Sequence, residues 1–153
     1  MLFSGKVSGD LTALDYAYES ACGPLAVKAA FTAASFEHLV QPQGETDGAY
    51  PILHLSVPDL TQATSGQFLP FSAGAGQTPA VLVTYDIGPG PTKSCKNTAP
   101  TGAGTPPNAG TATLTYGKTQ KGETMSIIID GWVTCDAGTT WKQFKYTASG
   151  IAF

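Results

Sequence analysis

The sequence predicts a single all-β domain over residues 1–153, an antiparallel β-sandwich or a Greek-key or jelly-roll-like barrel of about eight to ten strands. Composition is the first reason: Glu, Lys, Gln and Arg, which favour helices, are scarce, whereas Thr, Val, Tyr, Phe and Ile favour strands. The second reason is the alternation of apolar and polar residues over short runs. The third is that the long crossovers of a parallel sheet are missing. A chain of 153 residues also has the size of one ordinary domain.

Two strands are predicted near the N-terminus. Phe3 and Val7 share one parity and Lys6 has the other, which is the pattern of a half-buried strand. The run from Leu14 to Glu19 then places three large side chains on one face, and Gly23-Pro24 ends this second strand.

The stretch from Leu25 to Val40 is ambiguous, because its apolar residues fit both the helical period and a period of two. It is rich in Ala, but no Ser, Thr, Asp or Asn stands before it as an N-cap. We interpret it as one long strand or two, and the alternative is a helix that would make the fold α+β. Residues 41–48 are expected to form a polar turn.

Three segments in the middle of the chain are expected to form strands of different quality. Ile52 to Val57 is a short strand that Pro58 stops. Phe68 to Phe71 contains a proline and therefore suits an edge at best. Ala80 to Tyr85 is almost continuously apolar, which favours a central position in a sheet.

Residues 87–110 have the least pattern. This segment contains five Pro and five Gly, with few apolar side chains to bury. We therefore expect a long, mobile, Pro/Gly/Thr-rich surface loop.

The last third of the chain alternates most clearly. Thr alternates with apolar residues from Thr111 to Tyr116, and a second alternating run extends from Met125 to Thr134. Gly131 interrupts that run and is interpreted as a bulge. Residues 143–146 and 151–153 complete the predicted strands.

Charge and hydropathy argue against several classes of function. Charged residues make up 12% of the chain, compared with about 25% in a typical soluble domain. All eight basic residues are Lys, and the net charge is -3, so the basic footprint of a nucleic-acid-binding protein is missing. No apolar run approaches the ~20 residues of a transmembrane helix, so we expect no such segment.

The three cysteines are Cys22, Cys95 and Cys135, and none has metal-ligand spacing. We expect one disulfide and one remaining thiol. Cys95–Cys135 is the first choice, because it would tie the Pro/Gly-rich segment to the end of a predicted strand. Pairing of Cys22 with either of the others is the alternative, and so are three free thiols.

The two ends of the chain carry a resemblance to known proteins. Phe3-Ser4-Gly5-Lys6-Val7-Ser8-Gly9 and Tyr146-Thr147-Ala148-Ser149-Gly150-Ile151-Ala152-Phe153 resemble the first and last strands of exported bacterial β-sandwich domains, often lipoproteins of unknown role. The resemblance implies an extracytoplasmic setting (periplasm, cell surface or secreted) and implies no activity.

Metal binding is a weaker expectation. His38 and His54 are the only histidines, and the copper-binding His-x-His pair of superoxide-dismutase-like sandwiches is missing. Glu45 and Asp47 share a loop in which their oxygens would suit calcium. We expect no cofactor, with copper or calcium as the alternative.

Aromatic residues are the most suggestive remaining class. Trp132 and Trp141 flank the predicted turn at Cys135, where indoles can form stacking platforms for sugars. Aromatic side chains also fill the cores of sandwiches, and core packing is the favoured interpretation, with a binding surface as the alternative.

Together these features predict a non-catalytic structural or binding domain of the cell envelope or surface. A subunit of a larger surface assembly is one form that this role would take. The expected partners are other surface proteins or glycans. A homo-oligomer would form through edge strands at Leu2–Ser8 or Ala148–Phe153. The alternatives are a carbohydrate-binding module that uses Trp132 and Trp141, and a copper-dependent sandwich enzyme that uses His38 and His54.

Overall fold

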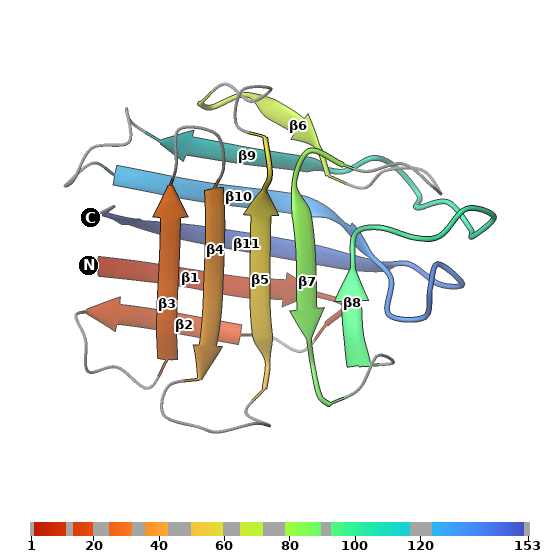
Figure 1. Ribbon diagram of the computed structural model, residues 1–153, viewed down its shortest axis with the longest axis horizontal. Coiled ribbons are helices and arrows are strands. Elements are labelled where there is room, and N and C mark those ends of the chain that lie inside the picture. The colour runs from red at the N-terminus through yellow and green to blue at the C-terminus, as the bar shows by residue number, and fades with distance from the viewer. Residues whose placement is uncertain are drawn as a thin grey trace.

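The computed structural model confirms the predicted fold class, because two antiparallel sheets pack as a sandwich (Figure 1). The structure describes residues 2–11, 14–19, 25–31, 36–42, 50–59, 65–71, 79–89, 93–116 and 124–151. Every regular element within those ranges is a strand. For β2, β3 and β4, the description is confined to the backbone.

Eleven strands lie within the described ranges, slightly more than expected, and two of them are only three residues long. One sheet has six strands in the order β2-β1-β11-β10-β9-β6, and the other has five in the order β3-β4-β5-β7-β8. Figure 1 shows the strands of the five-stranded sheet running across those of the six-stranded sheet. The strands are β1 (Leu2–Gly9), β2 (Leu14–Glu19), β3 (Leu25–Phe31), β4 (Phe36–Pro42), β5 (Ile52–Val57), β6 (Phe68–Pro70), β7 (Leu82–Asp86), β8 (Ser94–Lys96), β9 (Thr111–Tyr116), β10 (Thr124–Val133) and β11 (Lys142–Ile151).

The ambiguous stretch from Leu25 contains two strands, which confirms the strand interpretation over the helix. β3 and β4 pair antiparallel, from Leu25 opposite Pro42 to Phe31 opposite Phe36. The predicted central strand is also confirmed, because β7 lies between β5 and β8.

The expectation that the terminal strands form sheet edges is wrong. β1 pairs with both β2 and β11, and β11 pairs with both β1 and β10. The first and last strands therefore lie side by side in the interior of the six-stranded sheet (Figure 1). A strand's place in the chain does not determine its place in the sheet. Here the first and last strands satisfy each other's hydrogen-bonding groups.

The core lies between the sheets and follows the predicted alternation. On β10, Ile127, Ile129 and Val133 are buried, whereas Ile128 is 55% exposed. Four aromatic rings connect across the core. The ring centroid of Phe144 lies 6.0 Å from that of Phe71, 6.0 Å from that of Tyr85 and 6.4 Å from that of Tyr146.

Gly131 does not form the predicted bulge. The pairing of β10 with β11 runs without interruption from Thr124 opposite Ile151 to Val133 opposite Lys142. A Cβ atom at position 131 would overlap the ring of Phe71. Glycine is therefore needed here for the close approach of an aromatic ring to the strand.

The expectation that residues 87–110 have almost nothing to bury is also wrong. Within the described part of this segment, Cys95, Asn97 and Ala99 are buried, and Ser94–Lys96 pair with β7 as β8. The buried positions alternate with outward-facing ones, so a short strand pattern was hidden by the Pro/Gly-rich average composition.

Asn97 is the buried polar residue that holds this segment against the sandwich. Its side-chain nitrogen donates to the carbonyl oxygens of Phe71 and Val81, each at 2.7 Å, and its Oδ1 accepts from the backbone nitrogen of Val83 at 2.9 Å. The amide thereby satisfies three backbone groups that would otherwise be buried without partners.

Candidate binding face

The disulfide Cys95–Cys135 joins the two sheets, which confirms the first-choice pairing. The S–S distance is 2.04 Å, and the two cysteines are 40 residues apart in the chain. Next to it, Lys96 and Thr134 exchange two backbone hydrogen bonds of 2.9 and 2.8 Å. β8 of the five-stranded sheet is thereby fastened to the end of β10 in the six-stranded sheet.

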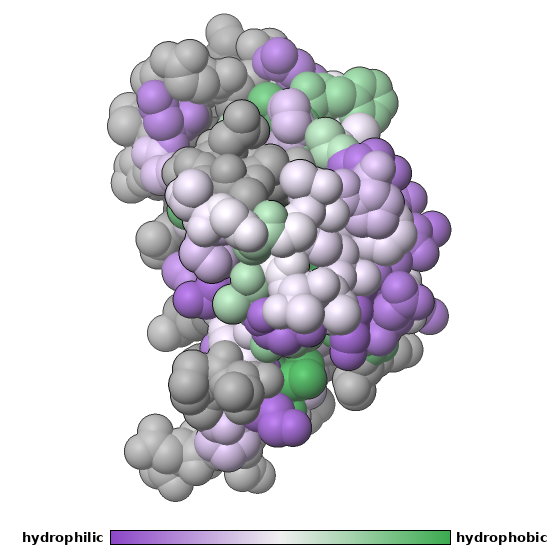
Figure 2. All heavy atoms as spheres, turned by 90° about the vertical axis from the view of Figure 1, so that its right-hand side faces the viewer, coloured by the Kyte–Doolittle hydropathy of each residue, from purple (hydrophilic) through white to green (hydrophobic). Residues whose placement is uncertain are grey.

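Residues 97–110, which we call the 97–110 loop, lie against residues 134–140, the 134–140 turn. The backbone nitrogen of Gly104 donates to the carbonyl oxygen of Gly138 at 3.1 Å. A Cβ atom at Gly138 would overlap that of Ala103 and would lie 2.9 Å from that of Ala99, so only glycine allows this approach. This end of the molecule is mostly of intermediate hydropathy, with strongly hydrophilic residues along one side (Figure 2).

The 134–140 turn is organised by Asp136. Its carboxylate accepts from the Thr134 hydroxyl at 2.9 Å, and from the Thr140 hydroxyl and backbone nitrogen at 2.6 and 2.8 Å. The hydrogen bonds from Thr140 and then Thr134 lower the pKa of Asp136 to about 2. The carboxylate therefore stays ionised at neutral pH and accepts the hydrogen bonds that hold the turn.

Both tryptophans are half-buried and hydrogen-bonded to the 97–110 loop. The indole nitrogen of Trp132 donates to Oδ1 of Asn108 at 3.2 Å, and that of Trp141 donates to the carbonyl oxygen of Gly104 at 3.0 Å. Neither side chain belongs to the buried core, so the favoured expectation of core packing is wrong for both tryptophans. Trp132 shares the outward face of β10 with Ile128 and Asp130, since the buried residues of that strand have the other parity.

A polar cluster surrounds Trp132 on this outward face. The register places Gln143 opposite Trp132 and Lys145 opposite Asp130. Asp130 accepts from the Gln143 side chain at 3.2 Å and pairs with the Lys145 ammonium at 3.5 Å. We call these four residues, Asp130, Trp132, Gln143 and Lys145, the Trp132 strip.

The Trp132 strip is tied to the N-terminal strand as well. The Asp10 carboxylate accepts from the backbone nitrogen of Gln143 at 2.9 Å, and the backbone nitrogen of Asp10 donates to the Gln143 carbonyl oxygen at 2.9 Å. A Cβ atom at Gly9 would overlap the same carbonyl, and its φ of 108° lies in a region that glycine favours. The backbone of Gln143 is therefore held by its pairing with β10 on one side and by Gly9 and Asp10 on the other.

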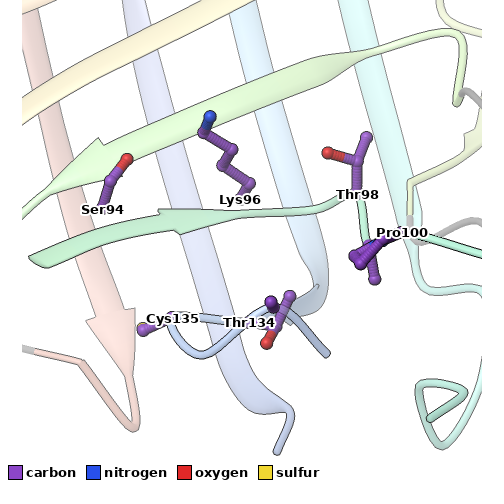
Figure 3. Close-up of a pocket in the computed structure, with 8 residues that line it drawn as sticks. Ser94, Lys96, Thr98, Pro100, Thr134 and Cys135 are labelled. Carbon is purple, nitrogen blue, oxygen red and sulfur yellow. The ribbon is translucent and has the colours of Figure 1, made fainter. Parts of the chain in front are cut away.

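An open pocket of about 270 Å³ lies beside Cys135, between the start of the 97–110 loop and the 134–140 turn (Figure 3). Ser94, Lys96 and Thr98 line it from β8 and the residues after it, and Thr134 and Cys135 line it from the end of β10. The Thr134 hydroxyl already donates to Asp136 and accepts from the backbone nitrogen of Gly138 at 2.7 Å. Figure 3 shows the Ser94 and Lys96 side chains directed away from Thr134 and Cys135, so the polar groups around the pocket do not converge on one point.

The structure does not bring the predicted metal ligands into one described cluster. His54 is exposed on β5 and pairs with Leu39, whereas His38 pairs with Leu55, so the two histidines occupy neighbouring rows. The side chain of His38 lies outside the described residues, as do Cys22, Glu45 and Asp47. Among the residues that are described, no three of His, Cys, Asp and Glu are placed to hold a metal ion.

Sequence reasoning singled out Trp132 but missed Asn108, Asp130 and Gln143 as its neighbours. The alternation along β10 contained part of the signal, because it placed Asp130 and Trp132 on one face. The pairing of β10 with β11 and the path of the 97–110 loop supply the rest, and neither has a local signature.

No protein-family model, no curated protein and no solved structure matches this chain. Within the described ranges, the structure contains no helix that is long and apolar enough to cross a membrane.

Proposed function

We propose that this protein is an extracytoplasmic, non-catalytic binding domain of the cell envelope or cell surface. The observation that carries the proposal is the disulfide between Cys95 and Cys135, which fastens the two sheets beside the 97–110 loop. Structural disulfides persist in oxidising compartments and are rare in the cytosol. The loop, the turn and the two tryptophans would form a fixed recognition surface at this end.

Two groups among the described residues have shifted pKa values, and both shifts support the proposed lack of catalysis. Hydrogen bonds lower the pKa of Asp136 to about 2, and burial raises the pKa of Tyr85 to about 12. Efficient general acid–base catalysis needs a pKa near the working pH. Both shifts move away from neutrality, which suits structural groups.

Thiol trapping in native cells tests the extracytoplasmic part of the proposal. Cells are quenched in acid, and the chain is then labelled with a polyethylene-glycol maleimide before and after reduction. We expect at most one label before reduction, on Cys22, and three labels after it. The chain should also fractionate with the envelope or the medium. Three labels without reductant, together with a cytoplasmic fraction, would contradict the proposal.

Carbohydrate binding is the second candidate, and the placement of the tryptophans favours it. Trp132 and Trp141 are both half-buried at the same end of the sandwich, and both indole N–H groups donate to the 97–110 loop. Acrylamide quenching of tryptophan emission tests whether the rings are accessible. Emission that resists quenching in the folded protein would remove this candidate.

A further inference from the structure

Trp132 presents a fixed ring on the outward face of β10. Oδ1 of Asn108 accepts from the indole nitrogen at 3.2 Å and from the backbone nitrogen of Gly110 at 2.9 Å, so one asparagine holds both the ring edge and the loop. The N–H group is thereby occupied within the protein. The side chain is half-buried, so what the indole can offer a ligand is the part of its ring that solvent reaches, which suits stacking against an apolar surface.

Hydrogen-bonding groups lie next to that ring. Gln143 is directly opposite Trp132, and the neighbouring pair, Asp130 and Lys145, lies ~7 Å farther along the strands. The Gln143 amide and the Asp130 carboxylate are joined by a hydrogen bond of 3.2 Å. A stacking ring beside coupled amide and carboxylate groups is suited to a ligand with one apolar face and many hydroxyls.

The charges near the ring further restrict the ligand. Asp130 and Lys145 form an ion pair of 3.5 Å in which both side chains are about half exposed. Asp10, which binds the backbone of Gln143 at 2.9 Å, adds a second carboxylate. An anionic ligand would face two carboxylates and one ammonium group, so an uncharged ligand is favoured.

We propose that the Trp132 strip is a glycan-binding site for uncharged sugars, in which the Trp132 ring stacks on a sugar ring and Asp130 and Gln143 bind its hydroxyl groups. This inference rests on the binding function proposed above and assigns it a site and a ligand class. Trp141 acts in this arrangement as a positioning residue for the 97–110 loop, through its hydrogen bond to Gly104.

Calorimetric titration with defined sugars tests the assignment. The probes are cellohexaose, xylohexaose, chitohexaose and maltohexaose, each up to ~1 mM, with hexagalacturonate as the charged comparison. We expect at least one uncharged hexasaccharide to bind, and hexagalacturonate to bind at least about ten-fold more weakly.

Three variants locate the site. Trp132→Ala should weaken binding by about ten-fold or more, and Gln143→Ala by about three- to ten-fold. Ile128→Ala is the matched control, because Ile128 is an exposed apolar residue on the same face of β10, outside the Trp132 strip. It should change affinity less than about two-fold. Unchanged thermal melting of each variant verifies that the fold is intact.

A spectroscopic measurement on the unmodified chain makes the test independent of variant folding. The two indole N–H signals in a nitrogen-correlated NMR spectrum are assigned with Trp132→Phe and Trp141→Phe. Addition of the hexasaccharide should shift the Trp132 signal more than the Trp141 signal.

Each of three results would overturn the inference: no uncharged probe binds, binding survives in Trp132→Ala, or Ile128→Ala weakens binding as much as Trp132→Ala. These failures are distinct from failure of the proposed function. A chain that is oxidised and located in the envelope, yet binds no sugar, would remain a binding domain for another partner, whereas a reduced cytoplasmic chain would refute the proposed function itself.

Discussion

Asn97 shows how one polar side chain can hold a segment that has little apolar surface. Its amide bonds three backbone groups, from Phe71, Val81 and Val83, at 2.7 to 2.9 Å. These groups belong to two described segments, residues 65–71 and 79–89, and would otherwise be buried without partners. The 97–110 loop therefore begins at a fixed point although its composition suggests mobility.

Substitution of Asn97 should be strongly destabilising. Asn97→Ala leaves one N–H and two carbonyl groups unsatisfied, so we expect the free energy of unfolding to fall by ~2–4 kcal/mol in urea titrations. Asn97→Asp, with the same shape, replaces the donor by an acceptor that faces two carbonyl oxygens and should be no better. Thr98→Ala, at the next and outward-facing position, should stay within ~0.5 kcal/mol. Equal effects at both positions would show that the Asn97 bonds do not matter.

Tyr85 makes stability depend on pH in the alkaline range. The side chain is fully buried, and burial raises its pKa to about 12, compared with about 10 in an unfolded chain. The folded protein therefore keeps the proton more tightly, and Tyr85 contributes its full stability below pH ~10. That contribution is lost as the pH rises from ~10 through ~12, by ~2–3 kcal/mol in total.

Urea titrations between pH 8 and pH 12 measure this effect as the difference between the natural chain and Tyr85→Phe. The variant should lose less stability than the natural chain as the pH rises. Parallel curves for the two proteins would show that Tyr85 does not titrate differently in the folded and unfolded states.

At the level of elements, strand β10 shows what can and cannot be predicted from the sequence. Alternation grouped Ile127, Ile129 and Val133 on one face and Trp132 on the other, because side-chain direction in a strand depends only on parity. It did not show which face is buried, and core packing was the favoured interpretation for the tryptophan. The structure buries the isoleucine face and leaves Trp132 outside the core. The role of Gly131 was missed, because a glycine that makes room for a ring and a glycine that makes a bulge look alike in one sequence.

Gly131 and Phe71 should therefore be energetically coupled. Gly131→Ala forces its new methyl group against the Phe71 ring, and we expect a loss of ~1–3 kcal/mol in the free energy of unfolding. In a Phe71→Leu background, the same change should cost less, because the smaller side chain leaves space. A double-mutant cycle measures the coupling, and additive effects would contradict this packing account.

The arrangement of elements was harder to predict than their existence. The strands at both ends of the chain were expected, but their pairing with each other was not, since the contact between Val7 and Tyr146 joins residues far apart in sequence. The Trp132 strip has the same origin. Asp130 and Trp132 share a face through local alternation, whereas Gln143 and Asn108 reach them only through strand pairing and the folded loop.

At the scale of the whole molecule, the disulfide links β8 of one sheet to the end of β10 in the other. It also lies beside the 97–110 loop, to which both tryptophans are hydrogen-bonded. Replacing Cys95 and Cys135 by Ala removes a cross-link that closes a chain segment of 40 residues. On the chain-entropy account, the free energy of unfolding should fall by ~4 kcal/mol. The backbone bridge between Lys96 and Thr134 and the bonds of Asn97 remain in that variant and should keep the sandwich folded.

The same variant separates global stability from local order at the candidate face. If the disulfide holds the 97–110 loop in place, its loss should increase acrylamide quenching of Trp132 and Trp141 under conditions where circular dichroism still shows a folded protein. Asn97→Ala provides a comparison of similar stability with the disulfide intact. Equal quenching in the natural chain and the double-alanine variant would mean that the hydrogen bonds of Asn108 and Gly104 alone fix the tryptophans, and that the disulfide serves only the stability of the fold.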